Sequence, residues 1–588
     1  MTIASTIVRR EPQKSDLQSF HPLLRRVYSS RGITSADELS TDLKGLLSYK
    51  DFKDIDKAVA RLAAAIANDE SILVVGDFDV DGATSSAIMV SALQAFGATT
   101  VNYLVPNRFS YGYGLSPEIV EFAAVDQPDL IVTVDNGISS HAGVERAREL
   151  GIEVIITDHH LPGQTLPAAY AIVNPNQTGC AFQSKNLAGV GVAFYVMLAL
   201  RAHLVEIGWF DSNGIDTPKM SDYLDLVALG TIADVVKLDK NNRTLVAQGL
   251  RRIRAGRFGP GMAALLQVSG RNYQKMKATD LGFAVGPRLN AAGRLDDMSL
   301  GISCLLSCNK TEALAMAKQL DDLNKERRVI EAQMKIDAFK AIDDLNLHND
   351  LPLGLCVYQE HWHQGVVGLV ASRVKEKIHR PVIAFAKVED GVLKGSARSI
   401  VGLHIRDVLE TIAIQRPDLI SKFGGHSMAA GLSLEESCYD QFVDAFVEEV
   451  SKRITKSDVK GRFETDGELS SSEMSLEMAE MLAEAGPWGQ GFPEPVFDGT
   501  FELASHRVVG TRHLKVVLKH HSSEHYIDGI VFNADLDLWP DYNVRTVFVV
   551  YRLDINDFGG RRRMQVIVDY IRPVDEDYSP DIDAVESL

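Results

Sequence analysis

The sequence has few cysteines, no excess of positive charge and no long apolar run. Only five cysteines occur among 588 residues, and none belongs to a CxxC pair, which argues against a zinc ribbon and a disulfide framework. No run of about 18 apolar residues is present, and the N-terminus lacks the apolar core of a signal peptide. We therefore expect a cytoplasmic protein that does not span a membrane.

Acidic residues outnumber basic ones, with 79 Asp and Glu against 61 Lys and Arg, which gives a formal net charge of −18. This balance excludes a generally basic nucleic-acid coat. It does not exclude a nucleic-acid enzyme, because bound cations or a local basic channel can reverse the field at one site. The length and the 45% hydrophobic content predict several globular domains with sizeable cores.

Short apolar runs alternate with helical patterns in the first part of the chain. The strand-like runs are 72–75, 130–134 and 154–156, and the intervening helical patterns include 85–96 and 141–150. This α/β alternation predicts a parallel sheet with helices on both faces. Ligands bind beyond the carboxyl ends of the strands in such sheets, so the polar residues after each run mark the predicted site.

The rest of the chain predicts a long helix, a smaller α/β domain and an OB-type β-barrel. Residues 311–346 contain no Gly or Pro and have apolar residues at helical spacing, which predicts a helix connecting two lobes. Five or six short strand-like pieces follow residue 495, among them 496–503 and 507–509. The expected parts are an N-terminal extension packed on the first domain (1–50), the catalytic domain (51–310), the connector helix (311–346), the second α/β domain (347–455), the barrel (456–573) and an acidic disordered tail (574–588).

Three carboxylates follow the first strand-like run within five residues, in the segment GDFDVDG. Asp77, Asp79 and Asp81 would repel one another without cations, so metal binding is favoured over a solvated turn. The segment partly resembles an EF-hand loop. However, Ile88 occupies the position of the bidentate glutamate, and the strand–turn–helix context differs.

Three further polar segments complete the predicted site. Asp135 follows the second run, Asp158-His159-His160 follows the third, and Asp234 interrupts an apolar stretch. Taken alone, these have plainer explanations: a turn, a core histidine and a helix N-cap. Together they supply hard oxygen ligands and imidazole, which suit Mn²⁺ or Mg²⁺ better than a closed structural zinc site. Two such ions can activate water and stabilise charge on a phosphoryl group.

These four segments, in this order, resemble the motifs of the DHH phosphoesterase superfamily. Other segments are similar to the RecJ family within it: NRFSYGYGL (107–115), PRLNAAGR (287–294), and the DHHA1-like segments HQGVVGLVASR (363–373) and FGGHSMAAG (423–431). GPWGQGFPEP (486–495) departs from the family's PFGxGNPEP, because Trp488 replaces Phe and Phe492 replaces Asn. The resemblance covers about residues 50–573.

The resemblance implies a set of site residues. Two Mn²⁺ or Mg²⁺ ions would be held by Asp79, Asp81, Asp135, His159 and Asp234, with Asp135 bridging the ions. His160 would hold the scissile phosphate or the leaving oxygen, whereas Asp77 and Asp158 would orient ligands, and Asp77 is also a candidate ligand. Val75 stands where related pyrophosphatases have a ligand His, which weakens that interpretation. The candidate substrate-binding residues are Arg108, Tyr113, Asn290, Arg294, Ser372, Arg373, Arg398, Ser399, Gly424, Gly425 and His426.

Several of these residues have plainer explanations that stay open. Tyr113 is either a base-stacking or a buried aromatic, Arg373 alone is typical of a surface, and the Gly424–His426 segment is also explained by a tight turn with a core histidine. The basic clusters Arg251–Arg257 and Arg561–Arg563 either contact the DNA backbone or form an ordinary solvated helix face and hairpin tip.

The resemblance implies a metal-dependent exonuclease that degrades single-stranded DNA from the 5′ end to mononucleotides, in DNA repair and recombination. It also implies that single-strand-binding protein and a helicase supply the substrate, and we expect a monomer. One alternative is a DHH phosphodiesterase acting on cyclic dinucleotides or short oligoribonucleotides, which usually lacks a terminal barrel. Another is a non-enzymatic scaffold with lost ligands, but every motif acid is present here.

Overall fold

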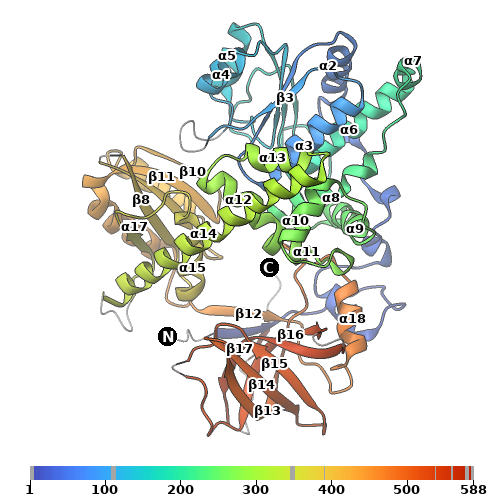
Figure 1. The fold of residues 1–588 in the computed structure, drawn as a ribbon. Helices are drawn as coiled ribbons and strands as arrows, with labels where there is room; N and C mark the ends of the chain where they lie inside the picture. Colours follow the sequence, from blue (N-terminus) through green and yellow to red (C-terminus); the bar gives the residue numbers. More distant parts are fainter. Residues whose placement is uncertain are drawn as a thin grey trace. The chain divides into compact units, whose positions relative to one another are not determined.

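The structure is a computed structural model that describes residues 5–107, 114–344, 351–389, 391–536, 538–557, 561–575 and 582–584. These residues form two compact units, each assembled from separate parts of the chain (Figure 1). Unit 1 contains the chain up to residue 12, residues 325–481 and the chain from residue 495. Unit 2 contains residues 13–324 and 482–494.

Unit 2 is built on a five-stranded parallel sheet, as the alternating pattern predicted. The strands lie in the order β3-β2-β4-β5-β6, and every neighbouring pair is parallel. Their carboxyl ends therefore meet at one edge. The strands are β2 (Ile72–Gly76), β3 (Val101–Leu104), β4 (Leu130–Val134), β5 (Glu153–Thr157) and β6 (Ala171–Val173).

Helices cover both faces of this sheet (Figure 1). On one face lie α2 (Ile55–Ala67), α3 (Val80–Ala95) and α6 (Gly189–Glu206), and on the other lie α4 (Pro117–Ala124) and α5 (His141–Glu149). Strand side chains alternate between the faces, so Val74 joins the first core whereas Leu73 and Val75 join the second. Burial on both sides explains why the strands are continuous apolar runs.

Among the described helices, α6 alone is long and apolar enough to cross a membrane. However, 67% of this helix is buried inside the structure, where Val192, Val196 and Leu200 pack in the core beside α2 and α3. This burial is typical of the central helix of a folded core.

The remaining helices of unit 2 follow the sheet in the chain or precede it. They are α1 (Pro22–Ser29), α7 (Trp209–Asn213), α8 (Leu224–Ala233), α9 (Lys240–Arg254), α10 (Pro260–Val268), α11 (Ala278–Asp280), α12 (Gly286–Leu295) and α13 (Ser299–Leu306). The helix α14 (Lys310–Asp344) is continuous over 35 residues and joins the two units, since the unit boundary falls between residues 324 and 325.

Residues 482–494 belong to unit 2 although they follow most of unit 1 in the chain. The rings of Trp488 and Phe492 stack at 5.0 Å, and Phe492 also stacks on Tyr28 of α1 at 6.3 Å. The guanidinium of Arg243 lies 4.5 Å from the centre of the Phe492 ring. The two aromatic residues that depart from the family pattern thus anchor this segment to unit 2.

The first part of unit 1 is a smaller α/β domain with a mixed sheet in the order β10-β11-β9-β8-β7. Only β7 and β8 pair in parallel among these strands. The strands are β7 (Leu355–Tyr358), β8 (Val382–Glu389), β9 (Val392–Arg398), β10 (Lys422–Gly425) and β11 (Ala429–Glu435). Helices α16 (Ile405–Gln415) and α17 (Tyr439–Arg453) share its main core, and α15 (Val367–Ile378) packs on β8 and β9.

A closed five-stranded barrel forms the last large part of unit 1, in the order β13-β14-β15-β17-β16. The predicted pieces 496–503 and 507–509 are one strand, because a bulge between Leu503 and Ser505 interrupts the pairing without ending it. Helix α18 (Leu476–Glu484) precedes the barrel. The strands are β13 (Phe497–Val509), β14 (His513–His520), β15 (Tyr526–Val531), β16 (Thr546–Asn556) and β17 (Arg563–Pro573).

A three-stranded parallel sheet differs from the expectation for both ends of the chain. β1 (Ser5–Arg9) pairs with β12 (Gly461–Thr465) and with β18 (Ile582–Ala584). We expected residues 1–50 to pack on the first domain and 574–588 to be disordered. β1 instead belongs to unit 1, where the Arg9 Nε atom lies 3.1 Å from both carboxylate oxygens of the buried Asp498. Within the tail that was expected to be disordered, residues 582–584 form β18, whose backbone pairs with β1.

Candidate active site

The turn after β2 presents the three aspartates of GDFDVDG at the carboxyl edge of the parallel sheet. Asp79 is the N-cap of α3, and its carboxylate accepts a hydrogen bond from Gly82 N at 3.0 Å. Asp77 accepts one from Phe78 N at 2.8 Å. A carboxylate at a helix N-terminus is stabilised by the free amides and the helix dipole, which explains why this acidic turn starts a helix.

Asp81 is fully buried, and the N-terminus of α6 holds its carboxylate. Gly189 N donates to one carboxylate oxygen at 2.7 Å and Val190 N donates to the other at 2.8 Å. Even so, burial raises the pKa of Asp81 well above its ordinary value, and the charges of Asp234 and Asp79 raise it further. Two amide donors do not offset this burial and repulsion.

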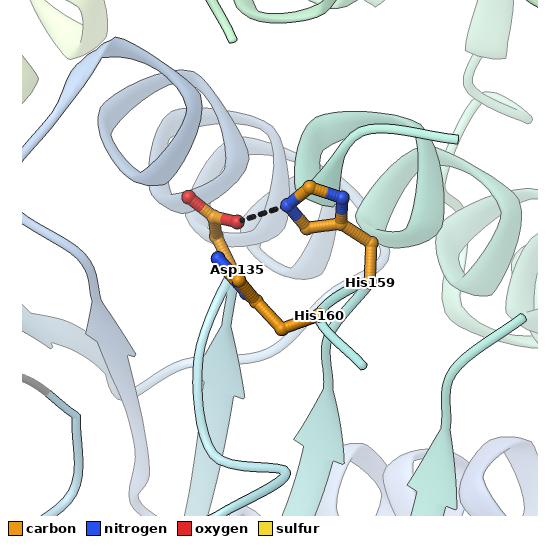
Figure 2. Close-up of side chains that lie close together, drawn as sticks. All are labelled: Asp135, His159 and His160. Atoms are coloured by element: carbon orange, nitrogen blue, oxygen red, sulfur yellow. Dashed lines mark ion pairs between the residues drawn. The ribbon is translucent and has the colours of Figure 1, made fainter. Parts of the chain in front are cut away.

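Asp135 leaves the end of β4 in a left-handed conformation, with a φ of 62°. Aspartate adopts this conformation more readily than most residues. Gly189 permits the approach of α6, since a Cβ there would lie 2.6 Å from Asp135 Oδ1. Burial, followed by the charges of Asp81 and Asp79, raises the pKa of Asp135 well above its ordinary value. Figure 2 shows the carboxylate pointing at the His159 ring, with 3.1 Å between Oδ1 and Nε2.

His159, after β5, brings the separate acids together. Its Nε2 atom lies 3.5 Å from Asp234 Oδ2 and 3.9 Å from Asp81 Oδ2, besides the contact with Asp135. One imidazole nitrogen thus faces carboxylates from three different parts of the chain. The four segments predicted to form one site do converge.

Asp234 is the C-cap of α8, so the alternative of a helix N-cap is wrong. A carboxylate is unfavourable at a helix C-terminus, where the dipole is negative. Burial and the charge of Asp79 raise the pKa of Asp234 to about 7. The next residue, Val235, has a φ of 62°, which is strained for a β-branched side chain. The C-cap position of Asp234 and the strained backbone of Val235 do not stabilise the fold, but both fix where this carboxylate lies.

The donor set fits divalent cations. Three groups of ligand atoms lie within 4.8 Å of one another: Asp77, Asp79 and Asp135; Asp81, His159 and Asp234; and Asp135, His159 and His160. Within the described part of the chain, the buried Oδ2 of Asp234 accepts no hydrogen bond. Several carboxylates and an imidazole around one space match Mn²⁺ and Mg²⁺, and cations there would relieve the repulsion that raises the pKa values.

His160 is held by Asp158. The Asp158 carboxylate lies 2.7 Å from His160 Nδ1 and accepts hydrogen bonds from the backbone of His159 and Ile138. Burial alone would lower the pKa of His160, but the hydrogen bond to Asp158 and nearby carboxylates raise it to about 9. Burial alone would raise the pKa of Asp158, but its bond with His160 and the charges of both histidines bring it below the ordinary value. Without cations, the raised pKa of His160 and the lowered pKa of Asp158 favour an imidazolium beside a carboxylate at neutral pH.

The structure adds supporting residues that the sequence reasoning missed. Asn174 Nδ2 donates to His160 O at 2.9 Å, and Asn176 Nδ2 donates to His159 O at 2.6 Å. Asn136 Nδ2 donates to Val75 O and Val134 O, which ties the ends of β2 and β4 together. The signal was the apolar run 171–173 followed by Asn174, the same strand-end pattern as in the other motifs.

The predicted substrate-binding residues of unit 2 lie partly beyond the described structure. Arg108 and Tyr113 fall in 108–113, outside the described residues. Asn290 and Arg294 are four residues apart on α12 and so share a helix face. A Cβ at Gly293 of this helix would collide with the Phe78 carbonyl. α12 therefore packs directly on the acidic turn at Gly293.

In unit 1, several predicted residues gather where β9 ends and the β10–β11 hairpin turns. Arg398 pairs with Ala429 across the sheet, and its guanidinium lies against Gly368 at the start of α15. Gly425 has a φ of 143° and lies so close to Ala430 that a side chain would collide. His426 N donates to Ala429 O at 2.8 Å, so the turn is tight, but His426 is exposed and is not a core histidine. Gly424 faces open space.

Three other residues predicted in this region are already engaged by the protein. Ser399 is buried, and its hydroxyl donates to Leu403 O at 2.7 Å. Ser372 donates to Gly368 O at 3.0 Å within α15. Arg373 forms ion pairs with Glu331 at 3.1 Å and with Glu376 at 3.0 Å. The buried Ser399 hydroxyl does not fit the predicted phosphate contact.

Much of the two basic clusters is also engaged within the protein. Arg251 donates to Thr41 Oγ1 at 2.7 Å, Arg252 pairs with Asp222 at 3.1 Å, and Arg254 donates to Met276 O at 2.8 Å. These residues end α9, where positive charge complements the helix dipole. In the barrel, Arg562 pairs with Glu480 at 3.0 Å and Asp557 at 3.2 Å.

Three family models match successive parts of the chain. They are the DHH family N-terminal domain over residues 71–231, the DHHA1 domain over 353–456 and the RecJ OB domain over 465–570. The single-stranded-DNA-specific exonuclease RecJ of Dickeya dadantii (strain 3937) is 54% identical over 576 residues, which cover 98% of this chain and 100% of the relative. The protein of the same name in Escherichia coli (strain K12) is 56% identical over 94% of this chain and 96% of the relative. The chain belongs to the RecJ family.

A solved structure with the same architecture contains metal. The crystal structure of RecJ in complex with Mn²⁺ from Thermus thermophilus matches with a TM-score of 0.79 at 29% identity, over 97% of this chain and 80% of that one. The complex of the same RecJ with Mg²⁺ matches with a TM-score of 0.74 at 28% identity, over 97% and 79%. Both cations expected from the donor set are thus found in RecJ structures.

Proposed function

We propose that this chain is a metal-dependent exonuclease that hydrolyses single-stranded DNA from its 5′ end to mononucleotides, in DNA repair and recombination. The observation that carries the proposal is the convergence of Asp79, Asp81, Asp135, His159 and Asp234 at one sheet edge in a chain of the RecJ family. These five residues are the ligands that we propose for two Mn²⁺ or Mg²⁺ ions. When bound, such ions make water a nucleophile at neutral pH and stabilise negative charge on the phosphoryl group.

The chain's own residues position these groups. The α6 amides orient the Asp81 carboxylate, and Asp77 beside Asp79 and Asp135 supplies a further ligand or steadies its neighbours. The imidazolium of His160, oriented through Nδ1 by Asp158, can donate from Nε2 to a phosphate oxygen. A donor aimed where negative charge develops lowers the barrier for hydrolysis.

We propose that the hairpin edge of the DHHA1 domain binds the end of the DNA strand. Arg398, His426 and the open face of Gly424 lie together there, and backbone amides near glycines suit phosphate. Asn290 and Arg294 of α12 would contact the strand near the acidic turn. Arg108 and Tyr113, outside the described residues, stay proposed substrate contacts on the family resemblance alone. Ser372 and Arg373 would contribute after exchanging their present partners, whereas Ser399 and Gly425 would shape the edge.

The remaining assignments are also proposals. We infer that the chain is divided into the parts expected from sequence, except for β1 and β18. We also infer that it is a monomer and acts in the cytoplasm. Single-strand-binding protein and a helicase are the proposed suppliers of the strand. The net charge of −18 makes electrostatic capture of DNA dependent on local basic residues and bound cations.

Digestion of end-labelled DNA tests the activity. A single strand labelled at its 5′ end should release labelled mononucleotide at once with Mn²⁺ or Mg²⁺, whereas a 3′-labelled strand should release label only at the end of digestion. A blunt duplex and a dinucleotide serve as controls. Early release of the 3′ label, or faster hydrolysis of the dinucleotide than of the long strand, would contradict the proposal.

A further inference from the structure

The loop between β6 and α6 (residues 174–188), called the β6–α6 loop below, contacts both histidines of the acidic site. Asn174 directly follows β6, and its Nδ2 atom donates to His160 O at 2.9 Å. Asn176 Nδ2 donates to His159 O at 2.6 Å. Two adjacent histidines with different proposed roles thus each receive one side-chain amide from the same loop.

The amide of Asn174 does more than build the turn after β6. Its side chain is buried, and its Oδ1 atom accepts a hydrogen bond from Asn176 N at 2.7 Å. A turn of this kind needs only the acceptor oxygen, which other short polar side chains also supply. The bond from Nδ2 to His160 is additional to the turn, so the amide at this position has a second task.

Other contacts hold the two ends of the β6–α6 loop together. Asn176 Nδ2 also lies 3.2 Å from Lys185 O, and Lys185 Nζ donates to Cys180 O at 3.0 Å. The loop ends where α6 begins, at Gly189, whose amide donates to the Asp81 carboxylate at 2.7 Å. One continuous segment of the chain therefore contacts both histidines and a buried acid of the site.

The backbone of the two histidines is held on both sides. The carboxylate of Asp158 accepts hydrogen bonds from His159 N at 2.7 Å and His160 N at 3.1 Å. The amides of Asn174 and Asn176 hold the carbonyl groups. Bonds of this kind fix the direction of a side chain before a ligand arrives.

We propose that Asn174 and Asn176 are positioning residues with separate tasks. Asn176 sets the affinity of the cation site through His159, and Asn174 sets the rate of hydrolysis through His160. The division of tasks rests on the proposed function, which assigns His159 to the cations and His160 to the phosphate. Removing a residue that orients a metal ligand lowers metal affinity or activity by about 10- to 100-fold.

Calorimetric titration of the full-length protein with Mn²⁺ tests the task of Asn176. Asn176→Ala should bind Mn²⁺ about tenfold more weakly than the wild type, whereas its kcat at saturating Mn²⁺ should stay close to that of the wild type. Asn176→Gln keeps an amide donor and should recover part of the affinity. The control is Gln183→Ala, an exposed amide of the same loop that donates to Ala181 O, and it should bind Mn²⁺ as the wild type does. Wild-type affinity in Asn176→Ala overturns the proposal.

Steady-state kinetics on single-stranded DNA test the task of Asn174. Asn174→Ala should lower kcat about tenfold and leave Mn²⁺ affinity close to that of the wild type. Asn174→Ser keeps an acceptor for the turn but is too short to replace the amide, so its kcat should fall to a similar extent. In a His160→Gln background, Asn174→Ala should cause no further loss, since it acts through that side chain. Losses that multiply in the double variant overturn the proposal, and urea unfolding checks that each variant is folded.

The two measurements separate this proposal from the proposed function. A wild type that binds Mn²⁺ but releases no nucleotide from single-stranded DNA would overturn the proposed function and the task of Asn174 with it, while the titration would still decide the task of Asn176. A wild type that digests DNA, with both alanine variants equal to it in Mn²⁺ affinity and kcat, would overturn the positioning proposal alone.

Discussion

The carboxyl edge of the parallel sheet in unit 2 and the hairpin edge of the DHHA1 sheet in unit 1 both gather predicted site residues, but in different ways. At the first edge, the acids and histidines face one another, although burial and repulsion raise the pKa of Asp81, Asp135 and Asp234. At the second edge, Ser399 and Arg373 already bond to protein groups. The first edge concentrates negative charge that divalent cations would neutralise, whereas some residues predicted for the second edge would have to exchange their present partners to bind a ligand.

The largest effect should come from removing a carboxylate of the first edge. Asp135→Asn should lower DNA hydrolysis on the order of 1,000-fold, because Asp135 is the proposed ligand shared by both cations. The same change should leave the metal-free protein as stable as the wild type or more stable, since one repelling charge is gone. Single-strand digestion and urea unfolding in EDTA measure the two effects.

The matched control for this change is Asp126→Asn, an exposed acid on the loop that precedes β4. It should alter neither activity nor stability by a measurable amount, since exposed charges contribute little. If Asp135→Asn destabilised the metal-free protein strongly, the carboxylate would be a structural group, and the contrast between the two edges would fail.

His160 should give the next largest effect. His160→Gln keeps a hydrogen-bond donor but removes the positive charge, so hydrolysis should fall about 100-fold through kcat. Metal affinity should stay within a few-fold of the wild type, because His160 is assigned to phosphate contact. Asp158→Asn should also lower the rate of hydrolysis. The double variant should hydrolyse DNA at nearly the same rate as His160→Gln, since both residues act through one imidazolium. Steady-state kinetics and Mn²⁺ titration separate these outcomes.

Much of the first edge could be predicted because a parallel sheet brings strand ends together whatever their separation in the chain. The positions of Asp135 and His159 at this edge follow from two strand-like runs alone, 130–134 and 154–156. Other features depend on contacts between distant segments: β1 pairs with β12 and β18, and residues 482–494 join unit 2 through Trp488 and Phe492. No local pattern specifies such partners.

Side-chain availability was also beyond the sequence. Arg373 matches the family segment, but its partner Glu331 lies on α14, 42 residues earlier. Ser399 looks like a polar end of a strand, yet Leu403 closes a turn over it and accepts its hydroxyl. Asp234 could be interpreted as an N-cap, because an apolar stretch does not show whether a lone acid begins the following helix or ends the preceding one. In the structure it ends α8. Partner geometry, and not residue type, decides these cases.

A pair of variants at the second edge sharpens the comparison. Arg398→Ala should raise the KM for single-stranded DNA about tenfold with little change in kcat, since a guanidinium near the hairpin is the proposed phosphate contact. Ser399→Ala removes a buried hydrogen bond to Leu403 and should lower the free energy of unfolding by about 1 kcal/mol without changing KM. If Ser399→Ala raised KM as much as Arg398→Ala, the buried hydroxyl would open on binding, and Ser399 would be a phosphate contact together with Arg398.

The smallest effect concerns Asp225, a buried acid of unit 2 that lies in the first turn of α8 and outside the cation site. Burial raises its pKa to about 6, from an ordinary value of 3.8. The folded state therefore holds this proton more tightly than the unfolded state, so stability falls as pH rises from about 4 to about 6 and stays lower above that. Asp225→Asn should remove this loss and gain about 1–3 kcal/mol at pH 8 relative to pH 4. Urea unfolding at both pH values measures the gain, with Asp216→Asn, an exposed acid of unit 2, as the control. If Asp225→Asn showed no gain in the free energy of unfolding at pH 8, burial by itself would not destabilise an acid in unit 2. Mutual repulsion would then account for more of the raised pKa values at the sheet edge than burial does.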